Sequence, residues 1–459
     1  MDKVKGPSRR WLSVIGLAAG SFVDGGEDQS ISILWPFMYR SLQVSIGQLG
    51  TVLGLSRLIM ALTLPLWGYA ADRFSRKTLL VCFTGFWGAW TLAISLVETF
   101  PQLLIVRLLS TLGLGIFIPA AFSLIGDLFG DQERGRAVGV ITATGVVGTV
   151  TAFIVLPAIA ANDAEAWRTG FMLMGSASIV TGLLLLLVEE PPRGASEPEI
   201  QDVISRATAR RYLFHWRDLR LLLKVQSWRW LLLSELLLSL GVGIVSGWAF
   251  TWLDSLGLGE SASLVVGLMA LGSIGGAILF GWVGDVVEAR FPNYGRIALV
   301  LAGKITLLPT LIFFVTANAE NVVLLTILGA LFGLAQATVG KALQWPLAQA
   351  VLLPELRASG RAAINIITGL TAALMLTLSG ALADRVGVPG MLLYIVPLPA
   401  LLSIVVWLPM FNSYARDRAI LHTILSQRRM ELLGAIDHVD KGSSNEQEVQ
   451  SMIIHQRAV

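Results

Sequence analysis

Three carboxylates lie together inside a long apolar stretch near the N-terminus, in the segment SFVDGGEDQ at 21–29. At 1.5 Å per helical residue they fall about 20 Å from the start of the stretch, near the middle of a bilayer. Ionised groups are costly at that depth and usually mark an ion or substrate pathway. Asp24 shares a helix face with Glu27 and with Asp28, so mutual repulsion is expected to leave one carboxyl protonated. The segment predicts a proton-binding site. The alternative is a helix break at Gly25-Gly26 that leaves the acids in an outer vestibule.

Two arginines in other apolar stretches are candidate partners for these acids. Arg57 lies about 16 Å into the second stretch, at the depth of the carboxylates, and Arg107 lies about 9 Å from the outer end of the fourth. An arginine that faces lipid costs several kcal/mol, so both should face a cavity or a carboxylate. For Arg107, snorkelling to the outer surface is the alternative. The leading expectation is a pair that joins Asp24 or Glu27 to Arg57 or Arg107.

A lysine near the middle of the tenth apolar stretch, Lys341, is the candidate substrate-binding residue. The polar and aromatic residues near it are Gln336, Gln344 and Trp345. A cation with amides and an indole beside it could bind an anion that carries a ring or a sugar. The alternative is a lysine neutralised by an internal carboxylate such as Glu235. Lys304, in the ninth stretch, is expected to be structural.

No residue pattern indicates catalysis or a bound cofactor. The chain has one cysteine, Cys82, which excludes a thiolate metal site and an internal disulfide. The histidines lie without ligand spacing at positions His215, His422, His438 and His455. Without a phosphate-binding loop, ATP is not expected as the energy source, and a proton gradient is the expected driving force. The net charge of +3 is too small to indicate nucleic-acid binding. We therefore expect neither an enzyme nor a cofactor or metal protein.

The elements that must position these residues are membrane-spanning helices. Hydrophobic residues make up 54% of the 459 residues and charged residues only 14%, where a soluble protein has about a quarter. Twelve stretches are long and apolar enough to cross a bilayer as helices. They are 11–38, 46–71, 78–97, 101–129, 136–161, 167–188, 229–255, 261–286, 295–317, 321–352, 361–384 and 389–410. The fold class is therefore an all-α membrane protein with twelve transmembrane helices.

Basic residues gather in the loops on one side of these helices. That side holds Arg9 and Arg10, the group Arg73-Arg76-Lys77, and Arg416 and Arg418, whereas the other side has few. By the positive-inside rule both termini are cytoplasmic, and we expect a multi-pass protein of the cell membrane. The first stretch has no small-residue cleavage site and is interpreted as a transmembrane helix, not as a signal peptide.

Three sequence similarities in the same order indicate an internal duplication. SRRWL at 8–12 corresponds to SWRWL at 227–231, and the segments 68–81 and 131–145 correspond to 281–300 and 354–369. Such repeats are typical of transporters whose site lies between two halves. The predicted domains are an N-terminal six-helix bundle (1–189), a cytoplasmic linker (190–228), a C-terminal six-helix bundle (229–411) and a cytoplasmic tail (412–459). In the linker we expect an amphipathic helix on the inner leaflet, with a solvated helix as the alternative, and in the tail a helix around 415–434.

The loop after the second stretch carries a family resemblance. Gly68-Tyr-Ala-Ala-Asp72-Arg73-Phe-Ser-Arg76-Lys77 resembles the G-x-x-x-D-R-x-G-R-R/K loop of the major facilitator superfamily, with Ser75 in place of the second glycine. The fourth stretch, from Arg107 to Pro119, is similar to the pattern R-x-x-x-G-x-G-x-x-x-x-P of that superfamily. The resemblance implies the major facilitator fold of two pseudo-symmetric six-helix bundles. It also implies that this loop gates the inward-facing state and does not bind substrate, and that Arg107 takes part in proton coupling or anion binding. Gly68 is expected to permit close helix approach. The basic residues of the loop are expected to meet the anionic inner leaflet.

Finer resemblances point in two directions. Asp24, Gly25, Glu27 and Pro36 resemble the first-span signature of organic-acid proton symporters, in which the carboxylates are implicated in proton coupling; Asp28 is an addition to that signature. The segments around Asp127 and Glu190 resemble Spinster-like lipid carriers, and the fifth stretch lacks the proline expected of drug exporters.

We therefore predict a transporter that works by alternating access, most simply a proton-coupled symporter of a small organic anion that functions as a monomer in the lipid bilayer. The alternative is a proton-linked exporter of amphiphiles, lipids or drugs. A receptor with a transporter fold that signals through its tail is a third hypothesis.

Overall fold

The computed structural model describes residues 7–129, 131–161, 163–191, 219–318 and 320–440. Within these ranges all regular structure is helical. The first group of helices is α1 (Pro7–Ser41), α2 (Gln48–Arg73), α3 (Arg76–Leu80), the π-helix η1 (Val81–Phe86), α4 (Gly88–Ile94), α5 (Phe100–Leu114), α6 (Phe117–Leu128), α7 (Asp131–Ala160) and α8 (Trp167–Leu185). The second is α11 (Leu219–Leu222), α12 (Gln226–Ser255), α13 (Glu260–Arg290), α14 (Gly295–Thr316), α15 (Val322–Thr338), α16 (Lys341–Val351), α17 (Pro354–Ile395), α18 (Pro397–Trp407) and α19 (Met410–Asp440).

The predicted membrane spans all have helical counterparts in the described ranges. Ten helical segments are long and apolar enough to cross a membrane, and one of them, 360–407, contains the last two predicted spans. It bends back at Gly387, whose φ of 74° and ψ of 165° interrupt the helix, in a region of φ that favours glycine. α1 is long enough to be an eleventh segment, but it carries three carboxylates in its middle. The all-α membrane fold is confirmed.

Two predicted spans are divided by short breaks that the hydropathy pattern does not reveal. α5 and α6 are separated at Gly115-Ile116, because Pro119 in the first turn of α6 has no N–H to continue the helical ladder. α15 and α16 are separated at Val339-Gly340, and Gly340 is extended with ψ of 176°. Both breaks lie beside polar residues of the candidate site.

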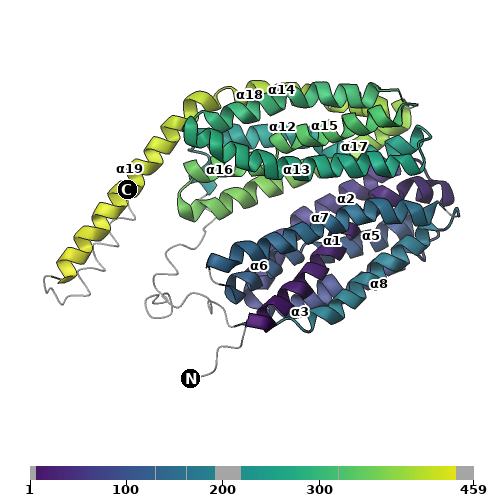
Figure 1. Ribbon diagram of the computed structural model, residues 1–459, viewed down its shortest axis with the longest axis horizontal. Helices are drawn as coiled ribbons and strands as arrows, with labels where there is room; N and C mark the ends of the chain where they lie inside the picture. The colour runs from purple at the N-terminus through teal and green to yellow at the C-terminus, as the bar shows by residue number, and fades with distance from the viewer. Residues whose placement is uncertain (1–6, 130, 162, 192–218, 319, 441–459) are drawn as a thin grey trace.

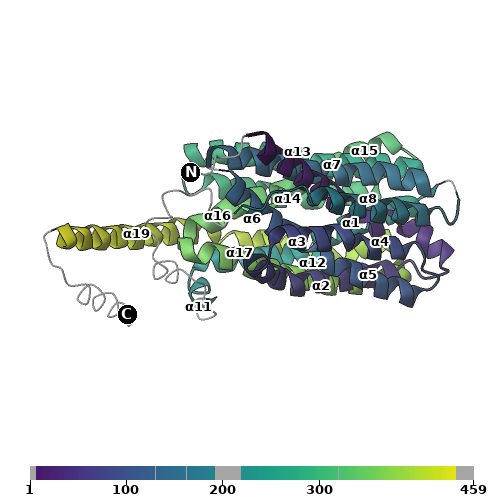
Figure 2. The same cartoon turned by 90° about the horizontal axis from the view of Figure 1, so that it is seen from below.

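The helices form two groups that run along the long axis of the molecule (Figure 1). α1–α8 make one group and α12–α18 the other. We call the end at which α1 begins and α19 leaves the terminal side, and the opposite end the far side. Seen along the perpendicular direction, α19 projects beyond the helices on the terminal side (Figure 2).

The two groups share one hydrophobic core on the far side only. A single cluster of buried side chains there joins residues of α1 and α2, such as Trp35, to residues of α12 and α17, such as Trp248. Toward the terminal side each group has a cluster of its own, one around Phe117 and one around Trp228. The groups are therefore packed together on the far side, and their ribbons diverge toward the terminal side (Figure 1).

Close backbone contact between α2 and α17 forms the seam of this packing. A side chain on Gly47 or Gly50 would collide with the backbone of α17 at Gly380, and the contact continues along both helices to Ala61, which faces Gly369. Ser45 Oγ donates to Asp384 at 2.9 Å, and Arg40 at the end of α1 forms an ion pair with Asp254 of α12.

The seam ends before Gly68 is reached. A Cβ atom on Gly68 would meet no heavy atom within 4 Å. The close helix approach that the sequence led us to expect at this residue is therefore absent from this conformation, because the two groups have already separated at this level.

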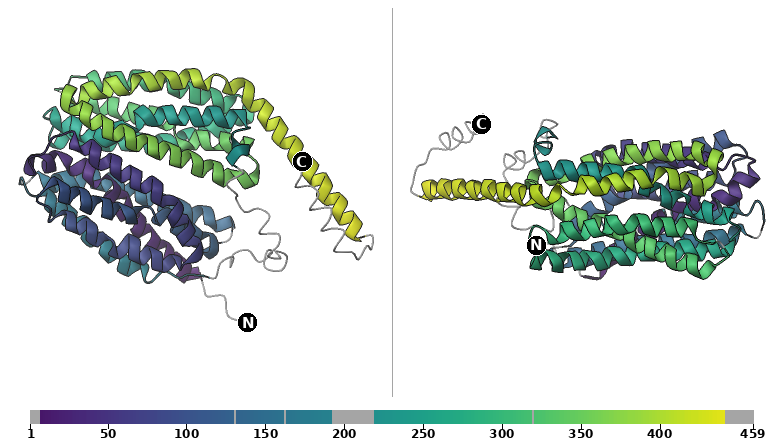
Figure 3. Two further views of the ribbon diagram at one scale, coloured as in Figure 1. Left: turned by 180° about the vertical axis from the view of Figure 1, so that it is seen from behind. Right: turned by 90° about the horizontal axis from the view of Figure 1, so that it is seen from above.

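Among the described residues, contacts with the C-terminal group hold the tail helix α19. The buried Asp417 carboxylate accepts hydrogen bonds from Ser227 N at 2.7 Å and Ser227 Oγ at 2.8 Å, at the start of α12. Arg418 donates to Glu288 at 3.2 Å and to Asn293 at 2.9 Å. Figure 3 shows α19 leaving this group. The helix predicted around 415–434 lies within α19. The predicted amphipathic segment of the linker, 202–225, lies outside the described residues up to position 218, and its remainder contains the short helix α11.

Candidate functional site

The acidic segment lies on an unbroken stretch of α1. The helix runs from Pro7 to Ser41 through Gly25-Gly26, so the predicted alternative of a break there is wrong. α1 crosses α7 at short range, because Gly25 faces the Gly145 carbonyl and Gly148 faces the backbone of Phe22. This contact fixes the height of the carboxylates within the N-terminal group.

Glu27 is buried and hydrogen-bonded by hydroxyl groups. Its side chain is 5% exposed and accepts a hydrogen bond from Thr91 Oγ1 of α4. Thr91 Oγ1 in turn lies 3.0 Å from Ser110 Oγ of α5. Asp24 and Glu27 line a small cavity of about 10 Å³ together with Thr84 and Ser178, close to the space that one water molecule needs. A carboxyl in this position can exchange a proton with a single water.

Asp28 takes the arginine that we had expected on Asp24 or Glu27. Arg57 Nη2 lies 3.1 Å from Asp28 Oδ2, and Gln29 Nε2 donates to the same oxygen at 2.7 Å. The carboxylate that the sequence comparison treated as an addition is therefore the one that forms the ion pair. Asp24 and Glu27 form no ion pair with an arginine among the described residues.

Arg107 faces the protein interior and does not snorkel. It is 2% exposed, and its Nη2 donates to the backbone oxygen of Asp28 at 3.4 Å. Its Nε and Nη1 have no hydrogen-bond partner in the described part of the chain. A buried guanidinium with free donors favours keeping a negative charge nearby.

The π-helix η1 belongs to this site and was missed from the sequence. Its wider turn leaves backbone carbonyls without helical partners, and Ser178 Oγ donates to Thr84 O at 2.7 Å. Thr84 Oγ1 is buried and has no partner within the described ranges. The sequence signal that could have revealed this site is the set of isolated hydroxyl residues in neighbouring spans, at the depth of the carboxylates. They are Thr84, Thr91, Ser110 and Ser178.

A second polar site lies in the C-terminal group at the break between α15 and α16. Lys341 is the first residue of α16 and is exposed. It lines a cavity with Glu235, Gln344, Trp345, Leu231 and Ile364. The structure therefore brings Lys341, Gln344 and Trp345 together as predicted. Gln336, on the other side of the break, is not among the lining residues. Arg57 and Arg361 both act on Lys341 electrostatically, so cations from both groups of helices converge here.

Lys304 does not take part in this cavity. It is 1% exposed, and its Nζ donates to Ser234 Oγ at 2.7 Å and lies 5.0 Å from the centre of the Trp407 ring. These contacts satisfy a buried ammonium within the protein, as expected of a structural lysine.

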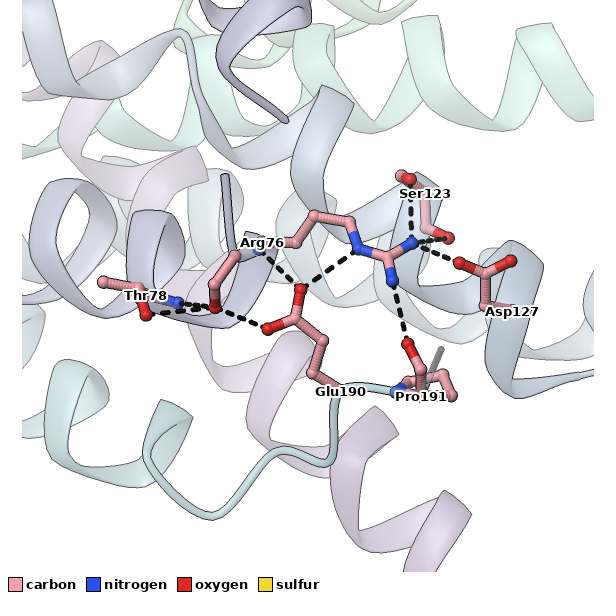
Figure 4. Close-up of polar contacts among 7 residues, drawn as sticks. Arg76, Thr78, Ser123, Asp127, Glu190 and Pro191 are labelled. Atoms are coloured by element: carbon pink, nitrogen blue, oxygen red, sulfur yellow. Dashed lines mark hydrogen bonds and ion pairs between the residues drawn. The ribbon is translucent and has the colours of Figure 1, made fainter. Parts of the chain in front are cut away.

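The predicted gating loop contains a buried ion-pair cluster (Figure 4). Arg76 is 1% exposed and forms ion pairs with Asp127 of α6 and with Glu190 after α8. It also donates to Ser123 O at 3.2 Å and Pro191 O at 3.1 Å. The expectation that Arg76 meets the membrane surface is wrong, because its charge is used inside the N-terminal group.

Glu190 and Ser75 complete this cluster. Burial would raise the pKa of Glu190, but hydrogen bonds from Ser75 Oγ and from the backbone and side chain of Arg76 outweigh burial and lower it. Ser75 also caps α3 by accepting from Thr78 N at 3.1 Å. Arg73, by contrast, is exposed and stacks on Tyr69 at 4.8 Å. The side chain of Asp72 lies outside the described residues.

Comparison with known proteins identifies relatives of this chain. The model of the Major Facilitator Superfamily matches residues 17–374. A sphingosine-1-phosphate transporter, SPNS2 of Danio rerio, is 31% identical over 156 residues, which are 33% of this chain and 30% of the relative. A 3-(3-hydroxy-phenyl)propionate transporter of Escherichia coli (strain K12) is 28% identical over 212 residues, which are 45% of this chain and 47% of the relative. The matches thus span less than half of either relative.

A solved structure is similar over most of the chain. The inward-facing, unoccupied bacterial homologue of the human lysosomal transporter Spinster has a TM-score of 0.72 and 17% sequence identity, and the match covers 91% of this chain and 98% of that one. At this identity the likeness concerns the fold.

Proposed function

The chain belongs to the Major Facilitator Superfamily, and from this premise we propose that it couples proton entry to the uptake of a small organic anion by alternating access. Membership makes the chain a multi-pass membrane transporter and not an enzyme. The driving force would be the proton gradient, without a cofactor. We further propose that it works as a monomer in the cell membrane with both termini cytoplasmic.

The acidic site on α1 supports proton coupling. Arg57 neutralises Asp28, whereas Glu27 is buried among hydroxyl groups and shares a water-sized cavity with Asp24. An ionised carboxylate in such a place would be poorly solvated. Glu27, with Asp24 beside it, is therefore the group that we expect to gain and lose the transported proton, with Arg57 and Arg107 biasing that step.

The cations around the second cavity support an anionic cargo. Arg361 and, more weakly, Arg57 act electrostatically on Lys341. Glu235 is the carboxylate that lines this cavity. The Escherichia coli relative is a transporter of an organic acid, 3-(3-hydroxy-phenyl)propionate, which agrees with an anionic cargo. Gln344 and Trp345 would contact the bound anion or its ring.

Uptake of a labelled organic acid, 3-phenylpropionate, into proteoliposomes tests the proposal. An inward proton gradient should accelerate uptake. Glu27→Gln should lower the rate of proton-driven uptake tenfold or more, while exchange of labelled for unlabelled substrate across the membrane persists. Glu320→Gln, at an exposed loop position, is the matched control. Full proton-driven uptake by Glu27→Gln would contradict the proposed proton site.

A proton-linked exporter of amphiphiles, lipids or drugs is the second candidate. The similarity to the sphingosine-1-phosphate transporter favours it, since the cargo of that relative is a lipid. The same proteoliposomes distinguish the two by direction. A symporter accumulates substrate on the side toward which protons flow, and an exporter accumulates it on the opposite side.

A further inference from the structure

Two opposite charges line the cavity at the break between α15 and α16 without pairing. Glu235 of α12 and Lys341 of α16 both line it. They attract each other electrostatically, yet neither side chain forms a hydrogen bond or an ion pair within the described ranges. Both groups therefore lack the close partner that a charge in a partly enclosed space normally has.

Lys304 does not form an ion pair with Glu235 in the described part of the chain. Its ammonium is directed to Ser234 Oγ at 2.7 Å and to the face of Trp407. No ion pair joins it to Glu235 among the described residues, although the two attract each other. The carboxylate of Glu235 therefore remains available on the cavity side.

The break between α15 and α16 orients the side chain of Gln344 so that its Oε1 lacks a hydrogen-bond donor. Gln344 is 2% exposed, and its Nε2 donates at 2.6 Å to Val339 O, a carbonyl that the break leaves without a helical partner. This bond directs the amide, and its Oε1 is left buried without a partner in the described part of the protein. A buried acceptor of this kind requires a donor, and Gln344 lines the same cavity as Glu235.

Trp345 and the start of α16, by contrast, require a hydrogen-bond acceptor or a negative group. Trp345 Nε1 is a buried donor that also lacks a partner among the described residues. Lys341 is at the first position of α16, and the N-cap Gly340 provides no side-chain cap. The first turn of that helix and the lysine both favour a negative group.

From these requirements we propose that the cargo is zwitterionic, with a protonated amine bound by Glu235 and Gln344 Oε1 and an acidic group bound by Lys341 and Trp345 Nε1. The enclosed space is about 10 Å³, which suits an ammonium group and not a whole molecule. Lys341 is exposed beyond it, so the acidic end and the body of the cargo extend toward the interface of the two groups of helices. This proposal rests on the proposed anion transport and adds the second charge.

Three probes of one size separate the two charges: L-phenylalanine carries both, 3-phenylpropionate lacks the amine, and phenethylamine lacks the acid. Their affinities for the purified full-length protein are measured by calorimetry and by thermal shift. We expect L-phenylalanine to bind at least tenfold more tightly than either of the others. Glu235→Gln should weaken L-phenylalanine at least tenfold and change 3-phenylpropionate by less than twofold, whereas Lys341→Met should weaken both.

The controls distinguish the zwitterion from the anion and from a structural role of Glu235. Glu320→Gln, an exposed carboxylate outside the cavity, should leave every affinity unchanged, and gel filtration should show that each variant is folded. Equal binding of L-phenylalanine and 3-phenylpropionate would overturn the zwitterion and leave anion transport standing. An equal loss of both probes in Glu235→Gln would show that Glu235 only supports the lysines. Binding by none of the three probes would overturn the proposed site as a whole.

Discussion

Replacing Arg76 by methionine should destabilise the protein strongly, although the residue lies in a basic surface loop. The guanidinium is 1% exposed and holds two carboxylates and the carbonyls of Ser123 and Pro191. Removing one partner of a buried ion pair costs about 3–5 kcal/mol. Asp127 and Glu190 are 15% and 24% exposed, so water can solvate them in part. We therefore expect a loss near the lower limit, about 3 kcal/mol.

Arg73 provides a matched control in the same loop. It is exposed and stacks on Tyr69 at 4.8 Å, so Arg73→Met should cost about 0.5–1 kcal/mol. The free energy of unfolding is measured by denaturant titration in detergent, followed by tryptophan fluorescence. In the double variant Arg76→Met/Glu190→Gln the losses should fall short of the sum by about 1–2 kcal/mol, because the two residues share one contact.

The relative size of the two losses decides whether the reasoning holds. If Arg73→Met destabilised the protein as much as Arg76→Met, burial and pairing could not be the cause. Strictly additive losses in the double variant would likewise refute a direct interaction between Arg76 and Glu190.

Three further predictions concern other parts of the structure. Gly50→Leu should force α2 away from Gly380 and reduce the population of this far-side-closed conformation, which cross-linking of cysteine pairs across the seam measures; unchanged cross-linking would contradict it. Because the pKa of Glu190 is lowered on folding, its contribution to stability is present above its ordinary value of 4.5 and is lost as the pH falls through the lowered value. The stability difference between the protein and Glu190→Gln should therefore shrink below pH of about 4.5, and a constant difference would argue against it. Asp417→Ala should leave the Ser227 donors unpaired and cost about 1–3 kcal/mol, with faster proteolysis of α19 as the measure; unaltered cleavage would show that α19 is held elsewhere.

The helices could be predicted from the sequence because the bilayer imposes a simple rule on length and polarity. Each apolar run of about 20 residues must satisfy its backbone within itself, so run length alone locates a span. The same rule identified Asp24, Glu27 and Lys341 as functional candidates, since charge is rare at that depth. The broken spans were beyond this rule, because Gly340 and Pro119 act on backbone conformation without changing the hydropathy of the run.

The partners of the charged residues could not be predicted in the same way. Depth placed Arg57 at the level of three carboxylates, but which of them it meets depends on the angular position of each around α1, and Asp28 presents the contact. Arg76 and Glu190 are 114 residues apart in the chain, so only the packing of the N-terminal group shows that a surface motif is an interior ion pair. The unused oxygen of Gln344 follows from a single backbone break and has no signature in the sequence.

The uninterrupted first helix has a mechanical consequence. α1 carries the candidate proton-binding residues Asp24 and Glu27 in its middle and Arg40, which is paired with Asp254 of the opposite group, at its end. At 1.5 Å per residue, about 18 Å of continuous helix, with Pro36 inside it, separates Asp28 from Arg40. A tilt of α1 by about four degrees at the carboxylates thus displaces Arg40 by more than an ångström. That displacement is enough to weaken the ion pair with Asp254, which depends on hydrogen-bond distance. Under the proposed function, gain or loss of a proton at Glu27 would thereby shift Arg40 relative to Asp254 on the far side.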